Sequence, residues 1–369
     1  ANGDSGEMAC DHYHQYKNDI ALMSDVGLQA YRFSISWPRV LPDGTGKVNQ
    51  QGLDFYSRLV DELLEKNINP WVTLFHWDFP YALFCRGGWL NRDSADWFAD
   101  YTALLVDKLS DRVSQWSTLN ERQCFISLGH LDGTHAPVLI LGLSEVLLAA
   151  HNELLAHVKS VQVIRANART EPHISVAQAN KISIPESEHP DDIEAARQHM
   201  FSVREKHLFS NSWFSDPMIL GQYPEEGVSL FAAEMPEIVD GDLECINQQL
   251  DYFGTNIYSG VHVRAGNDDG FEIVEKNDLP VTQMGWPVTP EALYWGPKFI
   301  HERYQLPIVV TENGMANDDV VENGKVYDKQ RIEYLYQYLG EYSRAIKDGV
   351  PAQGYFLWSM ICLLYTSDA

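Results

Sequence analysis

The chain has 369 residues, of which 45% are apolar and 12% aromatic, a composition that supports a folded core and excludes a disordered chain. The chain contains 27 Lys and Arg and 52 Asp and Glu, so its net charge is −25. This charge disfavours binding to nucleic acid or to an anionic membrane surface, and it favours a neutral ligand without naming one.

The cysteines indicate reduced thiols. They are odd in number, far apart in the chain, and never form a C-x-x-C pair, which favours a cytoplasmic location. No apolar run reaches the roughly 18 residues that a membrane span needs, and no charged-then-apolar leader opens the chain. The first residues resemble a segment from inside a longer protein, so a lost N-terminal signal stays open. The five cysteines are Cys10, Cys85, Cys124, Cys245 and Cys362.

Short runs rich in β-branched and aromatic residues alternate with longer segments of helical spacing. This alternation is typical of repeated β–α units, in which helices join parallel strands. The predicted strands are AYRFSISW (30–37), NPWVTLFHW (69–77), VSQWSTLN (113–120), HISVAQAN (173–180), YFGTNIY (252–258), PIVVTEN (307–313) and GYFLWS (354–359).

Apolar residues between these strands recur at intervals of three and four, as on one face of a helix. Gly27 and Gly349 each follow such a segment, where a glycine commonly ends a helix. One predicted face contains Leu53, Tyr56, Leu59, Val60, Leu63 and Leu64, and a second contains Phe98, Leu105, Val106 and Leu109.

The ends of the strands favour a closed barrel over an open sheet, because barrel enzymes gather their active sites at the carboxyl ends of many strands. No GxGxxG or GxxxxGK[ST] motif supports nucleotide binding. We therefore predict an α/β fold, a single-domain (β/α)8 TIM barrel over residues 1–360. The polar or aromatic residues at the strand ends are Trp37, His76, Asn120, Glu121, Asn180, Asn256, Tyr258, Glu312 and Trp358.

A complete barrel of this type needs eight strands, whereas seven can be recognised. We expect the first strand to be missing from this chain. Residues 361–369 follow FLWSM with the unrelated string ICLLYTSDA, which we expect to be a foreign or out-of-frame tail.

Two glutamates each end an apolar strand. Glu121 follows WSTLN and Glu312 follows IVVT, so we expect both to project into the same cleft. Cleavage of a glycosidic bond with retention uses two carboxyls about 5–5.5 Å apart, one attacking the anomeric carbon while the other protonates the leaving oxygen. A single buried glutamate beside asparagine is more often structural. The pair indicates catalysis more strongly.

Four strings together resemble the motifs of glycoside hydrolase family 1, the β-glucosidase family. The likeness runs from Ala9 to about Ser359 in the family's motif order. It implies a (β/α)8 barrel and hydrolysis of β-D-glucosides through a covalent glycosyl-enzyme intermediate. It also implies β-galactosides or β-fucosides as further substrates, with neither cofactor nor metal. The strings are YRFSISWPR (31–39), TLFHWD (73–78), TLNE (118–121) and TENG (311–314), with ACDHYHQY and WFSDPMILGQYP in addition.

The resemblance assigns roles to single residues. The glutamate of the TLNE motif is the family's acid/base, which falls on Glu121, and that of TENG is the nucleophile, which falls on Glu312. Arg32 resembles the arginine beside the nucleophile, where a fixed positive charge lowers the carboxylate pKa. Tyr258 resembles the tyrosine whose hydroxyl bonds the same carboxylate.

Sugar binding is predicted for side chains that offer paired donors and acceptors or a flat apolar face. Asn120 resembles the family residue that bonds the sugar 2-hydroxyl, and Trp358 resembles the tryptophan that carries the sugar ring. Trp77 and Trp286 fit a core position equally well. The predicted substrate-binding residues are His76, Trp77, Asn120, Asn256 and Trp358.

The chain departs from the family pattern in three places. The QxEG motif of the first strand and the late DNFEW motif, both of which bind the sugar, have no counterpart, so we expect weak or no activity from these residues alone. Arg122 stands where the family usually has proline after the acid/base. A cation there would lower the pKa of Glu121, and we expect the alternation of the strand to turn it away.

Three other interpretations remain open. A 6-phospho-β-glucosidase differs mainly in residues that bind phosphate. A non-catalytic sugar-binding barrel is expected to have lost one carboxylate, and both are present. A truncated piece of an active glycosidase is compatible with the first interpretation. In each case the partner is a small carbohydrate such as a β-glucoside or a short oligosaccharide, and the oligomeric state is open.

Overall fold

The computed structural model describes residues 9–266 and 270–361. The chain divides into two compact units, and the single catalytic domain predicted for residues 1–360 stays a prediction. The predicted foreign tail, 361–369, lies outside the described residues except for Ile361. Unit 1 comprises Ala1–Gln15, Asn180–Phe201 and Phe253–Ala369, and unit 2 comprises Tyr16–Ala179 and Ser202–Tyr252.

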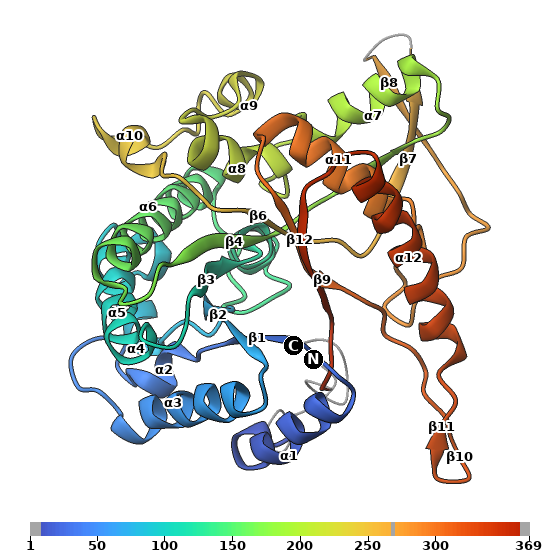
Figure 1. Ribbon diagram of the computed structural model, residues 1–369. Helices are drawn as coiled ribbons and strands as arrows, with labels where there is room; N and C mark the ends of the chain where they lie inside the picture. The colour runs from blue at the N-terminus through green and yellow to red at the C-terminus, as the bar shows by residue number, and fades with distance from the viewer. Residues whose placement is uncertain (1–8, 267–269, 362–369) are drawn as a thin grey trace. The chain divides into compact units, whose positions relative to one another are not determined.

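Unit 2 contains four parallel strands joined by helices (Figure 1). A long helix follows each of the first three strands and returns the chain to the start of the next, as parallel pairing requires. The strands, in sheet order, are β1 (Ala30–Ser34), β2 (Asn69–Phe75), β3 (Gln115–Asn120) and β4 (His173–Ala179). The helices are α3 (Gln50–Glu65), α5 (Ser94–Leu109) and α6 (Leu143–Asn167).

Shorter elements complete unit 2. Helix α1 (His12–Asp25) begins before the unit boundary and continues into it. The remaining elements are α2 (Trp37–Val40), α4 (Tyr81–Phe84), the 3-10 turn η1 (Gly88–Leu90), the π-helix η2 (Cys124–Leu131), α8 (Asn211–Leu220), α9 (Glu225–Leu230) and α10 (Asp242–Ile246).

Aromatic rings fill the core of unit 2. The ring of Phe75 lies 5.5 Å from Trp89 and 5.2 Å from Phe125, both near perpendicular, a geometry that aromatic pairs prefer. Trp37 stacks on Tyr101 at 5.1 Å, and its indole N–H donates to the carbonyl of Gly44 at 3.0 Å. Trp37 is therefore a core residue in α2 rather than a strand-end residue.

Unit 1 contains three parallel strands and a separate small sheet. Helices α11 (Ala292–Tyr304) and α12 (Lys329–Lys347) precede the second and third strand and pack side by side (Figure 1). The parallel strands, in order, are β6 (Phe253–Asn256), β9 (Ile308–Asn313) and β12 (Ala352–Leu357). The other elements are β5 (Ile182–Pro185), β7 (Gly260–Ala265) and β8 (Phe271–Val274) in one sheet, the hairpin β10 (Val321–Glu322) and β11 (Lys325–Val326), and α7 (Pro190–Phe201).

All seven predicted strands are present, and most end earlier than predicted. The sheet β5-β7-β8 was not predicted, although the run VHVRAGNDDGFEIV alternates apolar and polar residues around a turn-like GNDDG. The two predicted helix faces are buried except for Leu64, which is 38% exposed. Gly27 and Gly349 have φ of +80° and +98°, as helix-ending glycines require.

Asp242 at the start of α10 ties this helix to the rest of unit 2. Its carboxylate accepts two hydrogen bonds from Arg92, at 2.6 and 2.9 Å, and pairs with the His151 ring of α6 at 2.9 Å. Burial raises the pKa of Asp242, but the bonds from Arg92 and His151 outweigh burial and hold the pKa at about 2. In the part of the chain that the structure describes, no helix is long and apolar enough to span a membrane.

The low pKa of Asp242 predicts an acid-dependent contribution to stability. The folded pKa of about 2 lies below the ordinary 3.8, so the stabilisation is present above pH 3.8 and is lost as pH falls toward 2. We expect Asp242→Asn to lower the free energy of unfolding at pH 7 by about 2 kcal/mol. Urea unfolding at pH 7 and pH 2.5 should show this difference shrinking in acid. A constant difference would contradict the assignment.

Candidate active site

Asn120, the last residue of β3, is fully buried and connects three polar side chains in unit 2. Its Oδ1 accepts from Nη2 of Arg32 at 2.6 Å, which fixes the orientation of the amide because arginine can only donate. The amide nitrogen therefore donates to Nε2 of His76, at 3.1 Å, and the ring proton lies on Nδ1. Trp77 donates from its indole to the backbone carbonyl of Asn120 at 3.1 Å.

Glu121 lies in the turn that ends β3. Its side chain is largely buried, and its backbone N–H donates to the carbonyl of Ala177 in β4 at 2.7 Å. Its own carbonyl accepts from the N–H of Cys124 at 2.9 Å. The φ of Glu121 is +47°, a conformation that residues other than glycine adopt at a cost. The neighbouring contacts must therefore hold this turn.

Arg122 does not lie in a strand, so strand alternation does not set its direction; the chain is already helical at this residue. The side chain is fully buried. Its guanidinium donates to Oε1 of Gln178 at 2.6 Å and lies 3.6 Å from Oε1 of Glu153. These contacts place it among buried residues of β4 and α6, none of which is a predicted site residue.

Glu312 is the second carboxylate, in β9 of unit 1, and it is 5% exposed. The hydroxyl of Tyr258 donates to its Oε2 at 2.6 Å, which is at the short end of the range for hydrogen bonds between oxygens. Asn256 in β6 pairs with Glu312 in the strand register. The hydroxyl of Thr311 donates to Oδ1 of Asn256 at 2.6 Å, which fixes that amide. The parallel pair β6 and β9 thus positions both residues.

Two half-buried tryptophans flank Tyr258. The ring of Trp286 lies 4.9 Å away, and that of Trp358 lies 5.9 Å away at 84°. Each tryptophan offers a flat apolar face next to the residue that bonds Glu312, which is the kind of surface that sugar rings pack against. Trp286 was a weaker candidate from the sequence, and its contact with Tyr258 strengthens it.

Helix α12 supplies supporting residues that the sequence analysis missed. The hydroxyls of Tyr334 and Tyr338 donate to the backbone carbonyl of Tyr258 at 3.3 and 2.9 Å. Asn313 accepts a hydrogen bond from Tyr355 at 2.7 Å. The signal was available, because Tyr334, Tyr338 and Tyr342 recur every four residues and share one helix face.

The glycine of TENG is required by a close backbone approach. A Cβ at Gly314 would lie 2.0 Å from the carbonyl oxygen of Trp358. The N–H of Trp358 in turn donates to the carbonyl of Asn313 at 2.9 Å. Gly314 thereby lets the segment after β9 lie against the residue that follows β12.

The predicted site residues fall into two groups. Arg32, with His76, Trp77, Asn120 and Glu121, belongs to unit 2, and the others belong to unit 1. The separation of the two carboxyls and the place of Arg32 beside the nucleophile stay predictions. Over residues 9–266 and 270–361, no cluster of three or more His, Cys, Asp or Glu could hold a metal ion. The unit 1 group contains Asn256, Tyr258, Glu312 and Trp358.

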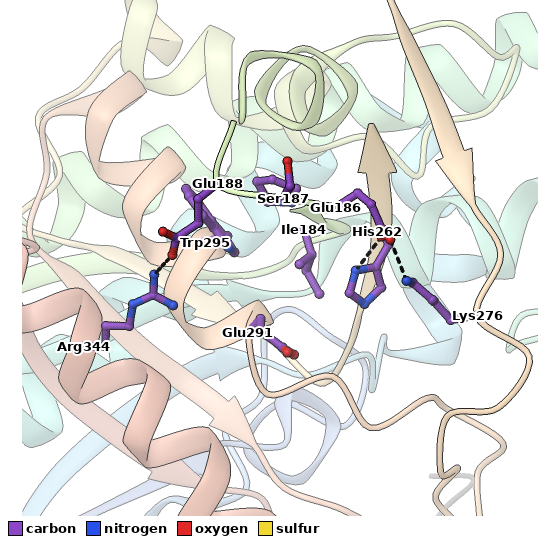
Figure 2. A pocket seen from close by; sticks show the side chains of 10 residues that line it. Ile184, Glu186, Ser187, Glu188, His262, Lys276, Glu291, Trp295 and Arg344 are labelled. Atoms are coloured by element: carbon purple, nitrogen blue, oxygen red, sulfur yellow. Dashed lines mark hydrogen bonds and ion pairs between the residues drawn. The ribbon is translucent and has the colours of Figure 1, made fainter. Parts of the chain in front are cut away.

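Unit 1 also contains a small pocket of about 220 Å³ (Figure 2). In it, Lys276 bonds Glu186 at 2.8 Å and Arg344 bonds Glu188 at 2.7 Å. The volume is below the roughly 300–1,000 Å³ of typical ligand sites. Because these cations already have carboxylate partners, and no predicted site residue lines the pocket, it supports no assignment.

The sequence matches the profile of Glycosyl hydrolase family 1 over residues 1–369. The chain belongs to this family. It is 46% identical to a 1,4-beta-D-glucan glucohydrolase of Thermotoga neapolitana, with 98% of this chain and 84% of the relative covered. It is 36% identical to the aryl-phospho-beta-D-glucosidase BglC of Bacillus subtilis, covering 98% and 80%.

The fold of this family 1 chain is similar to that of solved relatives. A family 1 β-glucosidase from Thermotoga maritima, solved in complex with isofagomine lactam, superposes with a TM-score of 0.86. The two are 44% identical over 97% of this chain and 80% of the other. The predicted (β/α)8-barrel fold is therefore confirmed.

The close approach at Gly314 predicts a position-specific cost. We expect Gly314→Ala to destabilise the protein by about 1–3 kcal/mol, because the added methyl group displaces backbone rather than a flexible side chain. The free energy of unfolding in urea measures this.

Gly340 in α12 is the matched control, since a Cβ there meets nothing within 4 Å. Gly340→Ala should stabilise by about 0.5–1 kcal/mol, as alanine does in helices. Equal effects of the two substitutions would show that the approach to Trp358 is unimportant.

Proposed function

We propose that the protein is a retaining β-glycosidase that hydrolyses β-D-glucosides, with Glu121 as acid/base and Glu312 as nucleophile. The hydrogen bond of 2.6 Å from Tyr258 to Glu312 carries the proposal. A tyrosine that donates to one carboxylate oxygen holds the carboxylate in a fixed orientation, which attack on a single carbon requires. The family and its β-glucosidase relatives support the substrate class.

The reaction proceeds in two displacements. In the first, a carboxylate oxygen of Glu312 attacks the anomeric carbon, and the bond to the aglycone oxygen breaks as Glu121 gives that oxygen its proton. The product is a covalent glycosyl-enzyme. In the second, Glu121 takes a proton from water, whose oxygen attacks the anomeric carbon and releases Glu312. Two inversions give net retention, and no cofactor or metal is required.

The buried polar residues give the sugar site its geometry in this proposal. Asn120 binds the 2-hydroxyl, and the bonds that Arg32 and His76 make to its amide hold it in one orientation. Contacts to this hydroxyl strengthen in the transition state. His76, Trp77 and Asn256 complete the polar contacts. Trp358 supports the sugar ring.

The proposed partner is a small neutral carbohydrate, a β-glucoside or short oligosaccharide, and β-galactosides and β-fucosides are further substrates of the same mechanism. Nucleic acid and membrane surfaces remain disfavoured by the net charge of −25. A cytoplasmic location belongs to the proposal and is supported by free cysteines at Cys10, Cys85, Cys124 and Cys245.

The alternatives have less support. Identity to the glucan glucohydrolase is 46%, against 36% for the aryl-phospho-beta-D-glucosidase, which favours a free sugar over a 6-phosphate. A non-catalytic sugar-binding protein does not need the hydrogen bond that prepares Glu312 for attack, nor two carboxylates at these motif positions. We therefore propose hydrolysis.

The nucleophile assignment is tested by Glu312→Gly. We expect release of nitrophenol from 4-nitrophenyl β-D-glucoside to fall by more than about 10³-fold, because the attacking group is gone. Added azide should restore nitrophenol release by displacing the aglycone directly, and the product should be the α-glucosyl azide.

The control is the unaltered 369-residue chain, assayed alone and with the flanking segments of the Thermotoga neapolitana relative added at both ends. Turnover by Glu312→Gly at the unaltered rate would reject the nucleophile. Inactivity of both unaltered forms, when folded, would reject hydrolysis of this substrate and favour a binding protein.

A further inference from the structure

A buried ion pair adjoins the proposed acid/base in the chain. Arg122 directly follows Glu121, and its side chain is 0% exposed, as is that of Glu153 in α6. Nε of Arg122 lies 3.6 Å from Oε1 of Glu153. A guanidinium stays protonated in proteins, so a full positive charge lies out of water opposite one carboxyl.

Two apolar side chains of α8 contact the guanidinium of this pair. Nη1 of Arg122 lies 2.6 Å from the sulfur of Met218, and the guanidinium carbon lies 5.6 Å from the centre of the Phe214 ring. Among the described residues, neither carboxyl oxygen of Glu153 has a hydrogen-bond partner. Glu153 therefore relies on Arg122 for compensation of its burial.

The other titratable groups near the pair do not replace either partner. Burial and the charge of Arg122 hold the pKa of His157 well below its ordinary value, and its Nδ1 lies 2.7 Å from Oγ1 of Thr118. Burial and Glu153 raise the pKa of Tyr223. Both are thus neutral at pH 7. Burial raises the pKa of Glu153, and the charge of the adjacent Arg122 opposes this rise by favouring the ionised carboxylate.

The pair is connected to the turn at Glu121 through successive residues of β4. The N–H of Glu121 donates to the carbonyl of Ala177, and the guanidinium of Arg122 donates to the side chain of Gln178. The ion pair with Glu153 also connects the guanidinium of Arg122 to α6. Because Glu121 has a φ of +47°, its conformation depends on contacts of this kind.

We propose that Glu153 is a positioning residue that holds the guanidinium of Arg122 and thereby fixes the turn that aims the Glu121 carboxyl at the leaving oxygen. The inference rests on the proposed acid/base role of Glu121. A proline at position 122 would restrict the backbone through its ring. Arginine lacks that restriction, and anchoring of its side chain takes its place.

Removing one partner has a different consequence from removing both. Without Glu153, the charge of Arg122 is buried and unpaired, which is strongly unfavourable, so the side chain moves toward water and displaces the turn. Replacing both partners with apolar residues of similar size removes the charge together with its need for compensation. Comparing the loss of Glu153 alone with the replacement of both partners therefore distinguishes positioning by the ion pair from simple packing.

The test compares two substrates of the 369-residue chain. Phenyl β-D-glucoside needs a proton from Glu121 to release phenol, whereas 2,4-dinitrophenyl β-D-glucoside has a leaving group that needs none. We expect Glu153→Leu to lower kcat/KM for the phenyl glucoside by about 10- to 100-fold, as misplacement of a catalytic group does. The dinitrophenyl glucoside should change by less than about twofold.

The double variant Arg122→Met/Glu153→Leu should return the ratio of the two kcat/KM values to within about twofold of the unaltered ratio. Circular dichroism verifies folding, and Glu153→Gln, which keeps the size and removes the charge, takes the place of Glu153→Leu if that variant does not fold. The positioning role would be overturned if Glu153→Leu lowered kcat/KM equally on both substrates. It would also be overturned if the double variant kept the ratio of the Glu153→Leu variant.

Glu121→Ala provides the reference. It should spare the dinitrophenyl glucoside much more than the phenyl glucoside. If it spares neither, the acid/base assignment fails. If the folded unaltered chain hydrolyses neither glucoside, even with the flanking segments of the Thermotoga neapolitana relative added, the proposed function fails. Both results differ from a failure confined to the Glu153 variants.

Discussion

Parallel pairing of strands is the constraint on which the candidate site depends. It brings the carboxyl ends of neighbouring strands to one edge, so residues far apart in sequence become neighbours within each unit. Asn256 pairs with Glu312 in this way, and Asn120 pairs with Ala177, the residue that holds the Glu121 backbone. The helices between the strands bury their apolar faces and fix these registers. The polar groups are thereby oriented without a ligand.

Buried polar groups are costly unless each finds a partner, and the candidate site meets this requirement mostly through side-chain hydrogen bonds. Asn120 and Asn256 each have an amide orientation fixed by a donor. The Arg122 and Glu153 pair meets this requirement through the attraction of opposite charges. Such a pair contributes little net stability. Its location next to Glu121 suits a role in orientation.

The sequence predicted the parts of this structure that depend on local pattern. Apolar runs located all seven strands, and the motifs located both glutamates and Tyr258. The sequence could not predict the role of Glu153, because that role depends on contact with Arg122, which lies about 30 residues earlier in the chain. The approach of Gly314 to Trp358 likewise depends on tertiary contact. The tyrosine stripe of α12 was visible in the sequence and was missed.

The stereochemistry of hydrolysis distinguishes the proposed double displacement at Glu312 from a single displacement by water. Proton NMR of the anomeric signals can follow the hydrolysis of 4-nitrophenyl β-D-glucoside before the free sugar equilibrates. We expect β-glucose to appear first and α-glucose to follow only by mutarotation, since two displacements retain configuration. If α-glucose appears first, hydrolysis occurs by a single displacement, and the role of Glu312 as nucleophile is contradicted.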